Sequence, residues 1–174
     1  NKAANEMRER LSDLLRRPIG RMWVGTFHSL AHRLLRTHFV EANLSSNFQI
    51  LDAQDQFRIV KRLMKENAID ETKFPIKKVQ WFINQQKDEG MSPQEIDSGY
   101  NYFVKQSTKI FNLYEKYCKA NDLVDFAGLL VKSYELLKNN KSLLEHYQKR
   151  FHHILIDEFQ DTNRIQYQWI KLLH

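Results

Sequence analysis

The 174-residue sequence has little cysteine, proline or glycine, and each shortage excludes a class of protein. The single cysteine, Cys118, rules out an internal disulfide framework and a cysteine zinc cluster, and it fits a reducing compartment. Three prolines and five glycines are too few for a turn-dense β-sandwich or barrel, so long helices are expected. No apolar run approaches the roughly 18 residues of a membrane span, and no signal-peptide pattern is present. The composition predicts a soluble, cytoplasmic, mostly helical chain without a membrane partner.

Charge is unevenly distributed along the chain. The formal net charge is +6, and residues 1–38 alone hold eight basic and three acidic side chains. Such a basic segment favours polyanionic partners, but a solvated helix face gives the same count. Charge alone therefore leaves both interpretations open.

The pattern of apolar residues predicts helices and two short strands. Helical spacing predicts a helix over residues 2–17 and, after a β-prone run at 22–27, a second helix near 30–39. Residues 43–150 read as successive amphipathic helices without a strand. Caps are predicted at Asp52 and Asp125, together with two capping boxes, at residues 92–95 and 142–145. A second β-prone run stands at 154–156. Two strands separated by about 125 mostly helical residues suggest an α/β sheet interrupted by a helical insertion.

Two acidic residues follow the second predicted strand directly. Ligands of open α/β sheets bind outside the carboxyl ends of the strands, and Asp157 and Glu158 occupy that position. An Asp there can hold a hydrated Mg²⁺ together with substrate phosphates, and a neighbouring Glu can orient or deprotonate a water. Two acids after a strand can also simply cap the next turn. The pair alone does not decide between chemistry and capping.

The residues around this pair carry a family resemblance. Residues 157–163 read Asp-Glu-Phe-Gln-Asp-Thr-Asn, which resembles motif II of superfamily 1 DNA helicases of the UvrD, Rep and PcrA type. Other segments match this family in order and spacing: residues 1–7 resemble the end of motif Ia, residues 23–30 resemble motif Ib, and residues 48–52 and 123–126 also correspond. The resemblance covers nearly the whole chain.

The resemblance implies a role for each matching position. Asp157 would ligate the Mg²⁺ of ATP, Glu158 would activate the hydrolytic water, and Gln160 and Asp161 would help to couple the nucleotide state to neighbouring motifs. The resemblance also places Thr26, Phe27, His28 and Asn1 along the path of single-stranded DNA. These residue types suit that role, because Thr and Asn can bind phosphates while Phe and His offer flat faces to bases.

The resemblance further implies the architecture and the biology. The parent fold would be a RecA-like P-loop NTPase of the α/β class, of which this mostly α-helical segment contributes a helical insertion and two strands of a parallel sheet. Residues 1–26 and 151–174 would belong to the first RecA-like domain, and residues 27–150 to the insertion. The parent would be an ATP-dependent 3′ to 5′ helicase that acts in DNA repair and replication. Its substrates would be single-stranded DNA and junctions with duplex, its further partners repair proteins, and its location the bacterial nucleoid.

Other candidate side chains favour ordinary structural roles. His28 and His32 stand one helical turn apart, but no third metal ligand is in an obvious place. The aromatic residues Trp81, Phe82 and Trp169 have the helical spacing of core residues, and Cys118 on an apolar stripe is expected to be buried and inert. Basic residues between 58 and 149 are mostly solvated faces, although some could contact duplex: Lys61, Arg62, Lys65, Lys77, Lys78 and Lys87.

One required motif of ATP hydrolysis is missing from these residues. The sequence has no phosphate loop of the type G-x-x-x-x-G-K-[ST], and it begins at Asn1 without a methionine inside a helical pattern. We therefore expect a segment of a longer protein that does not hydrolyse ATP by itself. A helical scaffold or interaction module, in which Asp157 and Glu158 are only capping groups, and the motor part of a helicase-nuclease remain alternatives.

Overall fold

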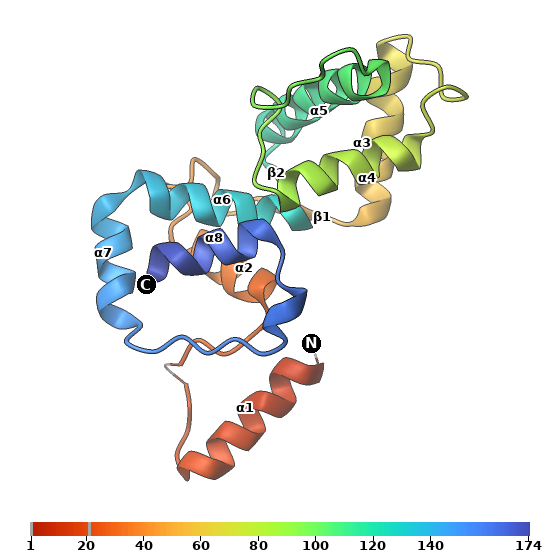
Figure 1. The fold of residues 1–174 in the computed structure, drawn as a ribbon. Coiled ribbons are helices and arrows are strands. Elements are labelled where there is room, and N and C mark those ends of the chain that lie inside the picture. The colour runs from red at the N-terminus through yellow and green to blue at the C-terminus, as the bar shows by residue number, and fades with distance from the viewer. Residues whose placement is uncertain (1, 21) are drawn as a thin grey trace.

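The computed structural model describes residues 2–20 and 22–174, and this part of the chain is mostly helical (Figure 1). None of its helices is both long enough and apolar enough to span a bilayer. In chain order the elements are α1 (Lys2–Leu15), α2 (Phe27–Thr37), β1 (Gln49–Leu51), α3 (Ala53–Glu66), α4 (Ile76–Asp88), α5 (Tyr102–Ala120), β2 (Leu123–Asp125), α6 (Phe126–Asn139), α7 (Lys141–Arg150), the 3₁₀ helix η1 (Phe159–Asp161) and α8 (Arg164–Leu173).

The helices form two lobes that meet at the strands. Helices α3, α4 and α5 make one lobe, here called the α3–α5 lobe, while α2, α6, α7 and α8 make the other, here called the α6–α8 lobe (Figure 1). Strands β1 and β2 lie where the lobes join, and α1 lies apart at the far end of the α6–α8 lobe. The chain therefore leaves the α6–α8 lobe along β1 and returns to it along β2.

The two strands pair in parallel, with Gln49 opposite Leu123, Ile50 opposite Val124 and Leu51 opposite Asp125. The prediction that residues 43–150 contain no strand is therefore wrong. Each strand has only three residues, which is too short for alternation to appear in the sequence. Both strands lie in segments that matched the family in order and spacing, 48–52 and 123–126.

The two strands predicted from sequence, at 22–27 and 154–156, do not form in the described residues. A strand is stabilised by ladder hydrogen bonds to a neighbour, and neither run has such a neighbour here. The carbonyl of Val24 instead accepts from the Arg8 guanidinium at 2.7 Å. Leu155 is 96% exposed, so its β-prone run gains no burial.

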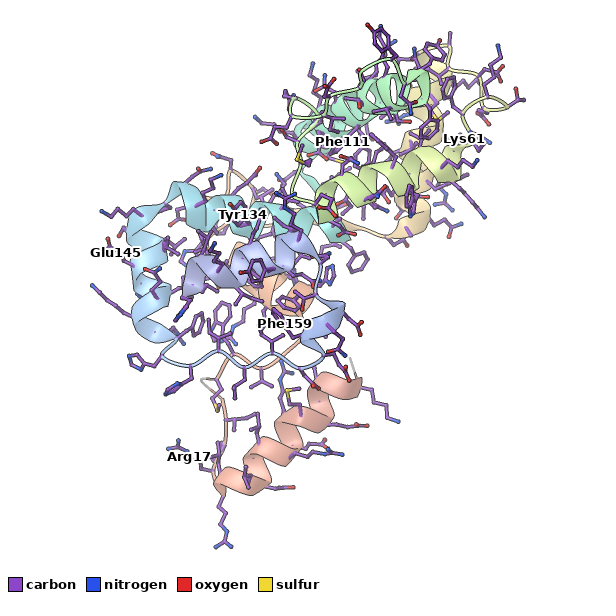
Figure 2. All side chains as sticks on the ribbon, in the orientation of Figure 1. Arg17, Lys61, Phe111, Tyr134, Glu145 and Phe159 are labelled. Atoms are coloured by element: carbon purple, nitrogen blue, oxygen red, sulfur yellow. The ribbon has the colours of Figure 1, made fainter. Side chains whose placement is uncertain are left out.

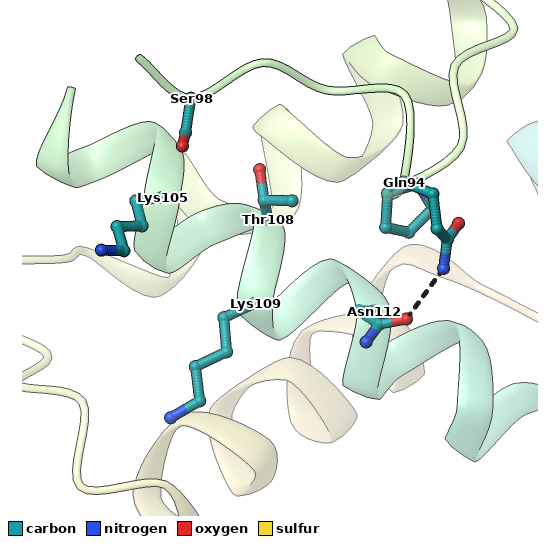
Figure 3. A pocket seen from close by; sticks show the side chains of 7 residues that line it. Gln94, Ser98, Lys105, Thr108, Lys109 and Asn112 are labelled. Atoms are coloured by element: carbon teal, nitrogen blue, oxygen red, sulfur yellow. Dashed lines mark hydrogen bonds between the residues drawn. The ribbon is translucent and has the colours of Figure 1, made fainter. Parts of the chain in front are cut away.

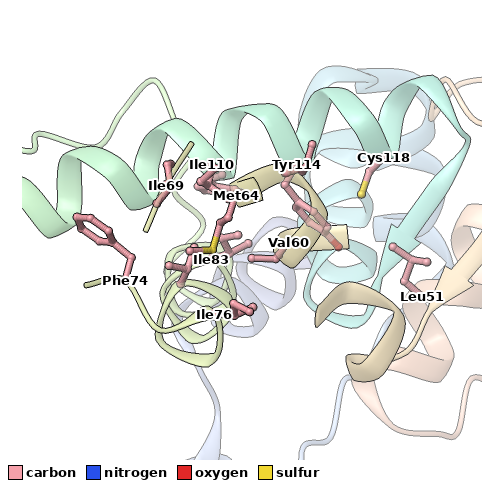
Figure 4. Packing of buried hydrophobic residues seen from close by; sticks show 13 residues of the cluster. Leu51, Val60, Met64, Ile69, Phe74, Ile76, Ile83, Ile110, Tyr114 and Cys118 are labelled. Atoms are coloured by element: carbon pink, nitrogen blue, oxygen red, sulfur yellow. The ribbon is translucent and has the colours of Figure 1, made fainter. Parts of the chain in front are cut away.

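The α3–α5 lobe has its own apolar core, drawn in Figure 4. Side chains of α5 pack against α3 and α4, and Tyr114 and Ile83 are almost completely buried. The buried members shared by the three helices and their connections are Leu51, Val60, Leu63, Met64, Ile69, Phe74, Ile76, Val79, Ile83, Ile110, Phe111, Tyr114 and Cys118. Removal of this apolar surface from water is the main force that stabilises the lobe.

The second core unites segments from both ends of the chain. Leu34 of α2, Leu130 of α6 and Ile165 of α8 are buried together in the α6–α8 lobe. Trp23 joins this core by edge contacts with Tyr147, at a ring separation of 5.4 Å. Residues before and after position 150 thus pack into one core.

The sequence-based caps have mixed outcomes. The carboxylates of Asp52 and Asp125 cap α3 and α6, as predicted. The capping box at residues 92–95 is wrong as a helix start, because Glu95 accepts from the Ser92 backbone and hydroxyl within a turn. Helix α7 begins earlier than predicted, since Asn140 is its cap and accepts from the Leu143 backbone N–H.

The predictions that single side chains are buried also have mixed outcomes. Phe82 and Trp169 are buried, as predicted, but Trp81 is 63% exposed, so its assignment to the core is wrong. Cys118 is buried, and this burial raises the pKa of its thiol to about 11, which keeps it protonated and unreactive.

Candidate functional site

The acidic motif lies in an exposed loop between α7 and α8. Asp157, Glu158, Gln160 and Asp161 are all exposed, and residues 159–161 form η1 (Figure 2 labels Phe159 on it). Glu158 has φ 51° and ψ 43°, a left-handed conformation that residues with a side chain adopt rarely. Its backbone N–H donates to the Asp157 carboxylate at 3.0 Å, and the Gln160 side-chain amide donates to the Glu158 carboxylate. The four predicted residues are thus held together by the loop itself.

The C-terminal part of this loop is anchored to α8. The Phe159 ring contacts the Tyr167 ring edge-on, with centroids 6.4 Å apart. Asn163 accepts from the Gln166 backbone N–H at 3.0 Å, and the Gln166 side chain accepts from the Asn163 backbone in return, which completes a capping box. The motif is therefore fixed to a helix that is buried in the α6–α8 lobe.

The predicted DNA-path residues lie at the start of α2. The Thr26 hydroxyl caps the helix and accepts from the Ser29 backbone N–H at 3.3 Å. The Phe27 ring lies 6.3 Å from the Trp169 ring, and the His28 ring meets the Phe126 ring edge-on at 6.0 Å. All three predicted residues are half-buried, and Asn1 falls outside the described residues.

Asp88, at the end of α4, links these two sets of residues. Its carboxylate accepts from the Asn163 side-chain amide at 2.9 Å. Burial lowers the pKa of His28, and the nearby Asp88 carboxylate opposes that shift. Burial likewise raises the pKa of Asp88, which His28 opposes. One half-buried carboxylate therefore bonds to the end of the acidic motif and acts electrostatically on the start of α2.

Asp88 was not predicted as a site residue, although the sequence holds one signal for it. An acidic side chain in the last turn of a helix is unfavourable, because the helix dipole leaves partial negative charge at that end. Asp88 ends α4 directly before Glu89 and Gly90. Such a misfit indicates a carboxylate that is held by something outside its own helix.

Lys87, the residue before Asp88, belongs to a buried ionic cluster that joins the two lobes. Lys87 Nζ lies 2.7 Å from Asp125 Oδ2 and 2.6 Å from Glu115 Oε1. The Tyr114 hydroxyl and the Gly128 backbone N–H also donate to Asp125, at 2.7 and 2.6 Å. Lys87 and Asp125 are 5% and 4% exposed. Lys87 is therefore an internal ion-pair partner, and the suggestion that it contacts duplex is wrong.

Burial and ion pairing have opposite effects on the pKa values of Asp125 and Lys87. Burial alone would raise the pKa of Asp125, but the charge and hydrogen bond of Lys87 outweigh it and the pKa is lowered. Burial alone would lower the pKa of Lys87, but Asp125 and Glu115 outweigh it and the pKa is raised. Both groups are therefore charged at neutral pH.

The described side chains do not form a metal-binding cluster of their own. Within residues 2–20 and 22–174, no three His, Cys, Asp or Glu side chains are grouped closely enough to hold a metal alone. The exposed Asp157 carboxylate fits Mg²⁺, which is commonly bound by one or two carboxylates plus substrate phosphates. His32 Nε2 accepts from the Arg36 guanidinium at 2.9 Å, so it is not paired with His28 as a ligand.

These features define the class of the chain: a two-lobed helical segment that carries an exposed acidic motif and a half-buried helix start predicted to follow DNA. Residues 1–174 match the family model of the UvrD/REP helicase N-terminal domain. The chain therefore belongs to this family.

The curated relatives agree with this assignment. The chain is 51% identical over 173 residues to DNA helicase II of Escherichia coli (strain K12), an alignment that covers 99% of the chain and 24% of that protein. It is 34% identical over 174 residues to the ATP-dependent DNA helicase PcrA of Bacillus subtilis (strain 168), with the same shares covered. The chain thus spans about a quarter of the length of these relatives.

Proposed function

We propose that this chain is the part of an ATP-dependent DNA helicase that carries the magnesium-binding motif and part of the DNA path. The parent would move 3′ to 5′ on single-stranded DNA and unwind duplex during DNA repair and replication. The family match over residues 1–174 and the names of the helicase relatives support this proposal. The chain alone lacks the phosphate loop, so we expect no ATP hydrolysis from it.

The acidic motif supplies the catalytic groups in this proposal. The exposed carboxylate of Asp157 would hold Mg²⁺ through the nucleotide, and bound Mg²⁺ would neutralise charge on the phosphates. Glu158 would orient and deprotonate the attacking water. Gln160, which is bound to Glu158, and Asp161, whose backbone N–H donates to the Glu158 carbonyl at 2.9 Å, would pass changes at the motif to neighbouring segments.

The start of α2 would follow the DNA. Thr26 and Asn1 would contact phosphates, while Phe27 and His28 would face bases of a single strand or of its junction with duplex. In this division, residues 1–26 and 151–174 belong to the first RecA-like domain, and residues 27–150 form the helical insertion.

One observation carries the proposal beyond the family name: Asp88 accepts a hydrogen bond from Asn163, at the end of the acidic motif, and its charge also acts on His28. A nucleotide-dependent change at the motif that moves Asp88 would therefore alter the electrostatic environment at the start of α2.

The proposal is tested by Glu158→Gln in the full-length protein that we expect to carry this chain. We expect DNA-stimulated ATP hydrolysis to fall by about 100-fold or more, because the general base is lost, while Mg²⁺–nucleotide binding persists. Glu145→Gln, an exposed glutamate of α7, is the matched control and should retain full activity. Equal activity of the Glu158 variant and the wild type would instead favour the helical scaffold.

A further inference from the structure

A small open cavity lies between α5 and the loop that precedes it, away from the acidic motif and the start of α2. Its volume is about 260 Å³. The loop contributes Pro93, Gln94 and Ser98, and α5 contributes Lys105, Thr108, Lys109 and Asn112 (Figure 3). No acidic and no aromatic side chain lines this cavity. Its chemistry is that of hydrogen-bond donors beside two positive charges.

The two lysines stand one turn apart on α5 and have no anionic partner in the part of the chain described. Lys105 and Lys109 are exposed, and no ion pair is formed by either of them. Like charges at this spacing repel each other and destabilise a helix. An anion between the two ammonium groups would remove that repulsion.

Thr108 gives an independent indication of a missing ligand. Its hydroxyl oxygen is buried and has no hydrogen-bond partner among the described residues. A buried hydroxyl without a partner is unfavourable, and native structures rarely leave one. Figure 3 shows Thr108 on the cavity side of α5, opposite Ser98 of the loop. If the side chain turns toward the cavity, its hydroxyl can donate to a bound oxyanion.

The acidic residues of the loop are engaged elsewhere. The Glu95 carboxylate accepts from the Ser92 backbone N–H at 2.8 Å, and the Asp97 carboxylate accepts from the Gly99 backbone N–H at 2.9 Å. Neither residue lines the cavity. The loop therefore holds its own negative charge within its turns.

We propose that this cavity binds a phosphate group, which Lys105 and Lys109 neutralise and to which the Thr108 hydroxyl donates. The absence of an aromatic surface excludes base stacking, so the site recognises the phosphate and not a whole nucleotide. The phosphate can come from inorganic phosphate or from a DNA backbone. This site goes beyond the proposed helicase function, because it uses none of the residues assigned to ATP or to the start of α2.

The test is a titration of the 174-residue chain with inorganic phosphate at constant ionic strength, followed by the NMR shifts of backbone amides. We expect saturable shifts at Ser98 and along residues 105–112. Lys105→Ala with Lys109→Ala should weaken binding about tenfold or more, because two charge-assisted contacts are lost. Shifts that are spread evenly over the basic surface would overturn the proposal.

A matched pair of lysines separates the site from general electrostatics. Lys61 and Lys65 are exposed on α3 at the same spacing and line no part of the cavity. Lys61→Ala with Lys65→Ala removes the same charge and should leave phosphate binding within about twofold of wild type. An equal loss in both double variants would contradict a built site.

Thr108→Val provides a second variant that keeps the volume of the side chain. It should weaken phosphate binding several-fold while the unfolding midpoint stays the same or rises, since an unsatisfied hydroxyl is removed. Unchanged phosphate affinity would show that Thr108 is not a ligand and would overturn the proposal.

A single-stranded oligothymidylate without a terminal phosphate distinguishes the two sources. If it shifts the same amides and the Lys105/Lys109 variant loses those shifts, the site takes backbone phosphate. If only inorganic phosphate does so, the site takes the free anion. Both results support a phosphate site, and neither depends on ATP hydrolysis by the full-length protein.

Discussion

Asp125 caps a helix and also closes the junction between the lobes. One of its oxygens accepts from the Gly128 backbone N–H, and the other accepts from Tyr114 and pairs with Lys87. A buried carboxylate of this kind is costly without its counter-charge. The stability of the junction should therefore depend strongly on Lys87.

Lys87→Met is expected to lower the free energy of unfolding by about 3–5 kcal/mol, because it leaves Asp125 buried and unpaired. Urea denaturation at neutral pH measures the change. The control Lys61→Met alters an exposed lysine of α3 and should change the free energy of unfolding by less than about 0.5 kcal/mol. Similar midpoints for the two variants would show that the ion pair does not stabilise the fold.

The same pair predicts a pH dependence with a definite sign. The pKa of Asp125 is lower in the folded chain than its ordinary value, so the fold binds this proton less tightly than the unfolded chain does. The resulting stabilisation is present above about pH 4 and is lost as the pH falls through the lowered pKa. In Lys87→Met, the lysine charge no longer outweighs burial, so the pKa of Asp125 should rise. Acidification should then protonate the buried carboxyl and relieve part of the destabilisation, so the acid-dependent loss of the wild type should shrink or reverse. Denaturation curves recorded from about pH 7 to about pH 3 test this difference.

His28 should titrate below its ordinary pKa of about 6.5, since burial disfavours its charged form. Asp88→Asn removes the carboxylate that opposes this shift, so the pKa of His28 should fall further. NMR titration of the ring protons measures it. His32 serves as the internal control, because its lowered pKa is set by burial and by Arg36. A rise in the pKa of His28 in the variant would contradict the electrostatic effect of Asp88.

Some single residues were accessible to sequence reasoning and others were not. Residues 157–161 could be identified because their order is local. Lys87 and Asp88 could not, since their partners Asp125 and Asn163 lie far along the chain. Trp81 was predicted to be buried and is exposed, because the helical spacing of aromatic residues does not reveal which side of α4 faces solvent.

Among the elements, the helices follow from sequence and the strands do not. Amphipathic periodicity and the caps at Asp52 and Asp125 mark α3 and α6 by local signals. The pairing of β1 with β2 is a long-range event between two three-residue segments. The runs at 22–27 and 154–156 have the composition of strands, but a strand needs a partner to form, and the described residues provide none.

The cap of α8 should contribute more to stability than the cap of α7. The Asn163 side chain accepts from the first turn of α8 and also donates to Asp88, whereas the Asn140 side chain accepts from the Leu143 backbone N–H within its own helix. Asn163→Ala is expected to lower the free energy of unfolding by about 2 kcal/mol and Asn140→Ala by about 1 kcal/mol. Urea denaturation compares the two variants, and an equal loss would indicate that the bond to Asp88 has no net effect.

For the whole chain, the basic N-terminal segment and the exposed lysines predict weak DNA binding that depends strongly on salt. The net charge is +6, of which +5 belongs to residues 1–38. We expect fluorescence anisotropy with a single-stranded oligonucleotide to show affinity that falls steeply with added salt, by counterion release. The same preparation should show no ATP hydrolysis. Affinity that is independent of salt would contradict a phosphate-dominated contact.

The parallel pairing of β1 and β2 makes residues 52–122 a closed excursion of the chain. The chain enters the α3–α5 lobe after Leu51 and returns at Leu123, and these two residues lie on neighbouring strands. The excursion is therefore a natural unit for exchange between related proteins. Because the strands are parallel, a hairpin cannot replace it: any substitute must be a crossover of about a dozen residues or more. It must also supply a cation at the position of Lys87, or else Asp125 must be replaced together with the lobe.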